Sequence, residues 1–96
     1  MWVEDLEDLH VEQEQDGEVV VREEGRAVLS RGTRPLVCFR FRRRGSGGEF
    51  GPPMLALVRL RKVHGGYQPE ARLNLSPEEA AALAASLGDP EDFRAP

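Results

Sequence analysis

The sequence predicts an α+β domain in which an antiparallel β-meander of five to six strands is followed by one C-terminal α-helix. Short apolar segments with alternating side chains recur between residues 11 and 75, separated by Gly-containing turns. One segment of helical periodicity follows at 77–87, and the 96 residues suit a single domain. An acidic arm at 1–10 precedes the sheet at 11–75, and a short tail at 89–96 follows the helix.

The acidic arm carries four apolar residues at near-helical spacing, namely Trp2, Val3, Leu6 and Leu9. This spacing predicts a short amphipathic helix or an ordered arm whose apolar edge lies against the domain. A second interpretation is that the arm competes intramolecularly with a polyanion for the basic part of the sheet.

Turn residues divide the first half of the sheet into strands. The Asp-Gly pair at 16–17 is a two-residue hairpin signal between strands at 11–15 and 18–23. The Glu-Gly pair at 24–25 predicts another turn, after which residues 26–31 form a third strand.

The strands at 36–43 and 54–63 alternate between two kinds of side chain, so each has one apolar face. The other face of each strand changes from apolar residues to Arg along its length. A loop rich in Gly and Pro joins the two strands. The expected core residues are Val37, Phe39 and Phe41 on the first strand and Met54, Ala56, Val58 and Leu60 on the second.

A hairpin follows the second of these strands. The Gly-Gly pair at 65–66 can adopt the positive φ of a type I′ turn, after which the chain returns as another strand. On this return strand we expect Leu73 and Leu75 to point inward. Arg72 and Asn74 are then expected to point outward.

The C-terminal helix has start and stop signals in the sequence. Ser76 is placed to cap the helix, Pro77 suits its first position, and Glu79 completes a capping box. Gly88 is placed to end it. Its apolar stripe consists of Ala80, Leu83, Ala84 and Leu87.

The net charge of −4 conceals a segregation along the chain. Residues 1–25 carry ten acidic side chains and one Arg, whereas residues 26–72 carry eleven basic side chains and two acidic ones. Residues 73–96 are again acidic. The basic central block creates a local field that suits a polyanionic partner such as nucleic acid.

The basic residues of the sheet form the candidate binding site. If the strands at 36–43 and 54–63 are neighbours, their Arg side chains and that of the return strand form one cationic face that can track a phosphate backbone. Tyr67, at the hairpin turn, is a candidate for stacking on unpaired bases. The predicted nucleic-acid-binding residues are Arg40, Arg42, Arg59, Arg61, Lys62, Arg72 and Tyr67.

Residue types that support catalysis or metal binding are sparse. Cys38 is the single cysteine, which excludes an internal disulfide and a Cys-rich zinc site and fits a reducing cytosol. Its setting favours a small buried hydrophobe over a reactive thiol. His10 and His64 stand in no metal-ligand spacing. We therefore expect no catalytic residue, metal or cofactor and, without a signal peptide or membrane span, a cytoplasmic protein.

The segment ARLNLSPEE at 71–79 and the order of elements before it resemble the PC4-like (p15 transcriptional coactivator) single-stranded-DNA-binding domain. The resemblance covers residues 36–88. It implies a curved sheet that leads into a helix, with dimerisation through the helices. It also implies that cationic groups contact the nucleic-acid strand at Arg59, Arg61, Lys62 and Arg72.

Several features depart from that family. Ala80 and Ala81 stand where an aromatic residue commonly follows the Pro-Glu pair, and a Glu-Ala pair at 70–71 replaces a Lys-Gly pair. The acidic N-terminal third has no counterpart in the minimal family unit.

Together these observations lead us to expect a non-catalytic, homodimeric protein that binds single-stranded DNA or RNA through an Arg-rich sheet face, in transcription or DNA maintenance. The alternative is a homodimeric protein-protein interaction module or small regulator that has no nucleic-acid ligand. Oligonucleotide binding that weakens with salt distinguishes the two.

Overall fold

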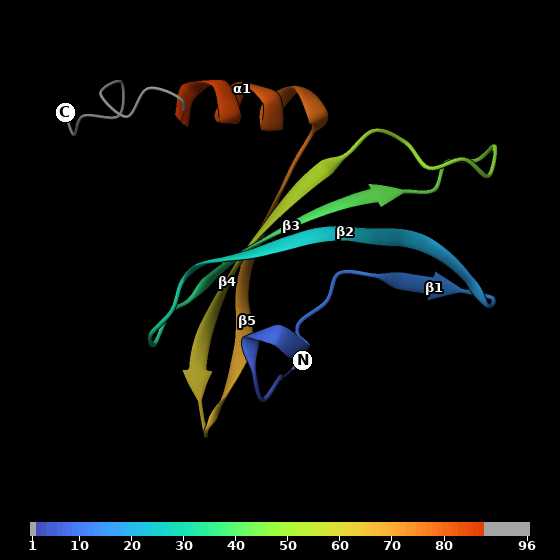
Figure 1. Cartoon of the computed structure of the whole chain (residues 1–96). Helices are drawn as coiled ribbons and strands as arrows, with labels where there is room; N and C mark the ends of the chain where they lie inside the picture. The colour runs from blue at the N-terminus through green and yellow to red at the C-terminus, as the bar shows by residue number, and fades with distance from the viewer. Residues whose placement is uncertain (1, 88–96) are drawn as a thin grey trace.

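The computed structural model describes residues 2–87 and contains one five-stranded antiparallel sheet followed by one α-helix (Figure 1). Each strand pairs with the next along the chain, in the order β1-β2-β3-β4-β5, which confirms the predicted meander and C-terminal helix. The predicted tail and the stop signal at Gly88 lie outside the described residues. The elements are a 3-10 helix at Leu6–Asp8, β1 at Gln13–Gln15, β2 at Glu18–Ser30, β3 at Leu36–Arg43, β4 at Met54–Val63, β5 at Gly66–Leu75 and α1 at Pro77–Leu87.

Strand β2 is longer than the sequence predicts. The expected turn at 24–25 is wrong, because β2 runs through it without a break. A register shift lies there instead: Glu23 pairs with Phe41 and Gly25 with Arg40, so Glu24 is an extra residue without a partner on β3. A β-bulge of this kind bends and twists a strand without ending it, so two predicted strands become one.

The two tight hairpins both use residues with positive φ. The first is confirmed, with φ of 53° at Asp16 and 80° at Gly17. The second is displaced by one residue from the predicted Gly-Gly pair, because His64 and Gly65 have φ of 47° and 79°. Gly66 begins β5 instead, where it has another role.

Gly66 provides space for the indole ring of Trp2. A Cβ atom at this position would overlap Cζ2 of Trp2 and stand 2.6 Å from the carbonyl oxygen of Val3. Contacts that short do not occur between unbonded atoms, so only Gly fits. The indole Nε1 of Trp2 donates to the carbonyl of Val63, 3.2 Å away. Val3 and Tyr67 exchange two backbone hydrogen bonds beside it, so the start of the chain is attached to the start of β5.

The core lies between the N-terminal segment and one face of the sheet. We call this the covered face; its central residues are Val37, Phe39, Phe41, Ala56, Val58 and Leu60, as the alternation predicts, and all are at most 4% exposed. Leu6, Leu9 and Val11 of the N-terminal segment pack against them and are themselves buried. The predicted arm is therefore ordered and supplies a second layer of the core.

Strand β5 presents the opposite faces from those predicted. Leu73 is 58% exposed and pairs with Leu57, whereas Arg72 pairs with Val58 of the covered face. The cause is a register shift between Arg59 and Leu60, which leaves one extra residue on β5. Because side chains alternate with a period of two, one extra residue moves every later side chain to the other face.

Helix α1 begins as predicted. The Ser76 hydroxyl accepts from the backbone N–H of Glu79 at 3.1 Å, and the Glu79 carboxylate accepts from the backbone N–H of Ser76 at 2.9 Å. These hydrogen bonds lower the pKa of Glu79 below its ordinary value. None of the residues of α1 is buried, and the helix lies away from the N-terminal segment (Figure 1). Its apolar stripe therefore takes no part in the core.

Candidate functional site

The second face of the sheet, which we call the outer face, has an apolar centre. It crosses three strands, because Leu57 of β4 pairs with Cys38 of β3 on one side and with Leu73 of β5 on the other. Leu55 and Leu75 form the next pair. We call this centre the apolar belt; its residues are Leu36, Cys38, Leu55, Leu57, Leu73 and Leu75.

The apolar belt is incompletely covered in the described part of the chain. Five of its six residues are half-buried and Leu73 is exposed. Helix α1 approaches only one end, where a groove of about 390 Å³ separates it from the sheet. The groove is lined by Arg40, Pro53, Met54, Leu55, Pro77, Ala80, Ala81 and Ala84. The helix therefore extends this apolar surface and does not cover it.

The arginines of β3 and β4 lie at opposite ends of the apolar belt. Arg40 pairs with Leu55, whereas Arg59 pairs with Leu36, because the two strands run antiparallel. Arg40 lies four positions after Leu36, a span of about 13 Å along the strand. Arg42 and Arg61 lie still farther apart, beyond the two ends. The single cationic face that the sequence suggests is therefore divided by apolar residues.

The single carboxylate of Glu24 offsets part of the positive charge at one of these two ends. Arg42 Nε lies 2.6 Å from an oxygen of Glu24, and Arg40 Nε lies 3.8 Å from the same oxygen. Arg42 also donates to the carbonyl of Gly51 at 3.0 Å. Glu24 is the extra residue of the β2 bulge, so a local irregularity supplies the counter-charge.

The other end keeps more of its positive charge. Arg59 donates to the backbone carbonyl of Arg34 at 2.9 Å. Arg61 and Lys62 are exposed, and within residues 2–87 neither forms an ion pair. This basic corner is the part of the predicted site that remains open to a phosphate group.

Arg72 and Tyr67 lie apart from that corner. The guanidinium of Arg72 lies 5.7 Å from the centre of the Phe41 ring, on the covered face, and donates to Asn74 Oδ1 at 2.8 Å. Partial burial, with a smaller effect of Arg43, lowers the pKa of Arg72. The expectation that Arg72 points outward is thus wrong, because the register shift in β5 turns its side chain to the covered face. Tyr67 is half-buried and packs against the core, with its backbone bonded to Val3.

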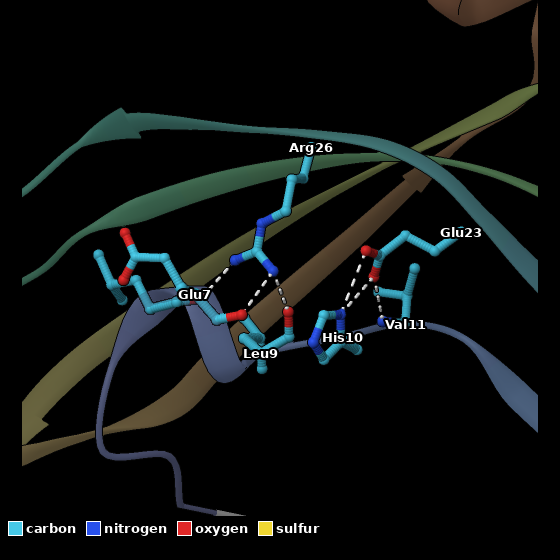
Figure 2. A network of polar contacts seen from close by, with 7 residues as sticks. Glu7, Leu9, His10, Val11, Glu23 and Arg26 are labelled. Carbon is cyan, nitrogen blue, oxygen red and sulfur yellow. Dashed lines mark hydrogen bonds and ion pairs between the residues drawn. The ribbon is translucent and has the colours of Figure 1, made fainter.

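Sequence reasoning missed the role of Arg26, which fastens the N-terminal segment to β2 (Figure 2). Its guanidinium donates to the carbonyls of Leu9 at 2.7 Å and Glu7 at 3.0 Å, and also to that of Leu6. These carbonyls lie at the end of the short 3-10 helix, where that of Leu6 also accepts from the backbone N–H of Leu9, 3.2 Å away. The only signal available beforehand was an isolated Arg on an otherwise apolar strand segment.

Glu23 completes this polar network (Figure 2). Its carboxylate accepts from the backbone N–H of Val11 at 3.0 Å and lies 3.2 Å from Nδ1 of His10. The N-terminal segment thus runs along the covered face and leaves Arg40, Arg59 and Arg61 of the outer face open. This position matches the interpretation of the acidic arm as a segment whose apolar edge lies against the domain.

Groups that could act chemically are few among the described residues. Burial raises the pKa of the Cys38 thiol, which favours the unreactive protonated form at neutral pH. Between residues 2 and 87, no cluster of three or more His, Cys, Asp or Glu side chains could hold a metal ion. No helix in that range is long and apolar enough to cross a membrane. Compared with known protein families, curated proteins and solved structures, the chain has no match.

Proposed function

We propose that this chain is a non-catalytic protein-interaction module that works as a homodimer, with the exposed Leu73 end of the apolar belt in its interface. The observation that carries the proposal is the uncovered centre of the outer face, where Leu57 and Leu73 meet across two strands. Contiguous apolar surface rimmed by polar residues marks sites of protein association. The belt has such a rim in Arg40 and Arg59.

The composition of the outer face resembles that of protein interfaces. An interface centre is apolar and depleted of charge, and Arg is enriched among interface residues because its guanidinium also packs on apolar groups. Covering the belt would stabilise a complex by about 25 cal/mol for each Å² of apolar surface removed from water. The exposed helix stripe around Ala80 and Ala84 adjoins the same surface.

We expect the substitution Leu73→Glu to weaken self-association by about 100-fold, because a carboxylate at an apolar contact between two copies loses its hydration. The matched control is Leu29→Glu, which introduces the same charge at a residue that is 56% exposed and lies outside the belt. Size-exclusion chromatography with light scattering gives the mass over a range of concentrations. A wild-type protein that stays monomeric at high concentration would contradict the proposal.

Single-stranded nucleic-acid binding is the second candidate. It is favoured by the basic corner of Arg59, Arg61 and Lys62, and by the resemblance of 36–88 to PC4-like domains. Arg59 and Arg61 share the outer face and can contact successive phosphates, whereas Lys62 points to the other face, and few bases could stack there.

The nucleic-acid candidate predicts a salt-sensitive affinity. Replacing Arg59 and Arg61 together by Ala should weaken binding of a labelled single-stranded oligonucleotide and reduce the slope of log affinity against log salt by about 1.4. Fluorescence anisotropy at two salt concentrations measures both effects, with Arg31→Ala, beside the N-terminal segment, as control. No binding at low salt would exclude this candidate and leave the protein interface.

A further inference from the structure

The last strand of the sheet has a free edge. Strand β5 pairs with β4 on one side, and on its other side only Tyr67 is bonded, to Val3. In the described chain, residues 71–75 pair with no strand on that side. An exposed strand edge is a template for pairing with another chain unless charge, Pro or a bulge blocks it. Here Pro69 and the bulge precede the free stretch and leave it open.

The backbone groups that point to this edge can be identified from the hydrogen bonds of β4. The amides of Leu60 and Lys62 donate at 2.9 Å toward the β3 side, to Pro35 and Thr33. Even-numbered residues of β4 thus face β3, so odd-numbered residues, including Leu57, face β5. The partner of Leu57 is Leu73, whose backbone groups therefore point back to β4.

Alternation along β5 then places the backbone N–H and C=O groups of Arg72 and Asn74 at the free edge. Both residues are exposed. The edge thus offers two residues whose donors and acceptors have no partner among residues 2–87, separated by the exposed side chain of Leu73 on the outer face.

We propose that two copies of this chain pair antiparallel along their β5 edges, about a two-fold axis at Leu73, to form one continuous sheet. The inference rests on the proposed homodimer and names the line of contact. In this register Arg72 stands opposite Asn74 of the second copy, and Leu73 stands opposite its own counterpart. Ala71 is then opposite Leu75 of the second copy.

This register follows from self-complementarity. A two-fold axis at Arg72 would place two guanidinium groups directly opposite each other, which destabilises a strand pair. An axis at Asn74 would place Arg72 opposite Ser76, which lies beyond the end of β5. With the axis at Leu73, Arg72 of each copy stands opposite Asn74 of the other. Both edge pairs then join unlike side chains.

The same register accounts for the exposure of Leu73. Leu73 is 58% exposed in a single chain, although it lies at the end of the apolar belt. Pairing about Leu73 would join the belts of two copies into one surface and place the two Leu73 side chains in contact. The C-terminal helices, which follow β5 directly, would then lie on the same composite sheet.

Disulfide trapping tests the register. In the Cys38→Ser background, Leu73→Cys should form a covalent dimer in oxidised glutathione, because a pair of this type has Cα atoms about 4.5 Å apart, within the range of a disulfide. The matched control is Leu75→Cys, whose two copies would be offset by four residues, or about 13 Å, and should stay uncrosslinked. Non-reducing electrophoresis of each variant reports the outcome.

Amide hydrogen exchange provides a second measurement that needs no substitution. The amides of Arg72 and Asn74 should exchange slowly at high protein concentration and faster on dilution, whereas that of Leu73 should stay protected. A protein with the mass of a dimer but neither Leu73→Cys crosslinking nor protection of these amides would overturn edge pairing and leave the homodimer intact. A monomeric mass at all concentrations would overturn both.

Discussion

Replacing Leu6 by Ala is expected to destabilise the protein by about 2–5 kcal/mol. Leu6 belongs to the N-terminal segment but is only 2% exposed, because it packs with the apolar residues of the covered face. Truncation would leave a cavity in the single core of a small domain whose total stability is about 5–15 kcal/mol. Urea unfolding followed by far-UV circular dichroism measures the loss, provided that both proteins are compared as monomers.

The control for this prediction is Leu29→Ala. Leu29 has the same side chain but is 56% exposed on β2, so its truncation should change stability by about 0.5 kcal/mol or less. Equal losses for the two substitutions would show that the N-terminal segment contributes nothing to the core. The contrast therefore separates a structural layer from a detachable arm.

Replacing Arg26 by Met is expected to cost about 2–3 kcal/mol, because hydrogen bonds from charged donors are worth more than neutral ones. Met keeps the aliphatic length of the side chain but leaves the carbonyls of Leu6, Glu7 and Leu9 without their donor. The N-terminal segment should then loosen. Urea unfolding gives the free energy, and a red shift of Trp2 fluorescence reports its release from Gly66.

The matched control is Arg31→Met, which removes an Arg from the same part of the molecule. Arg31 Nη2 lies 3.1 Å from the Glu7 carboxylate, but the side chains are 66% and 63% exposed. Exposed ion pairs contribute about 0–1 kcal/mol. If Arg31→Met cost as much as Arg26→Met, net charge and not the carbonyl contacts would hold the segment in place.

Much of the fold could be predicted because its signals are local. The alternation at 36–43 and 54–63 identifies the covered face, since a strand buried on one side must alternate. The capping box of Ser76 and Glu79 likewise involves only residues within one turn. The Asp-Gly hairpin at 16–17 is local in the same sense.

The bulges could not be predicted, and they decide which residues share a face. A single extra residue before Ala71 reverses the orientation of Arg72 and Leu73, yet no turn or breaker residue marks its position within β5 apart from Pro69. Register depends on how a strand fits its neighbour, which is a property of the assembled sheet. The apolar belt extends onto β5 through this reversal, because Leu73 and Leu75 join it only through the bulge.

The candidate site illustrates a second limit. The sequence suggests one cluster of arginines, because these residues occupy the same face of two strands. Antiparallel pairing, however, places the start of one strand beside the end of the other strand. Arg40 and Arg59 consequently lie at opposite ends of the belt. The role of Arg26 depends on carbonyls at least 17 residues away in sequence, and no spacing rule could reveal it.

The contact between Trp2 and Gly66 links two positions that are 64 residues apart. Because a Cβ atom at Gly66 would meet the backbone carbonyl oxygen of Val3 as well as the indole ring, a smaller side chain at position 2 would not by itself admit another residue at position 66. A glycine retained at position 66 would therefore identify distant relatives that keep this N-terminal layer after the rest of the sequence has diverged.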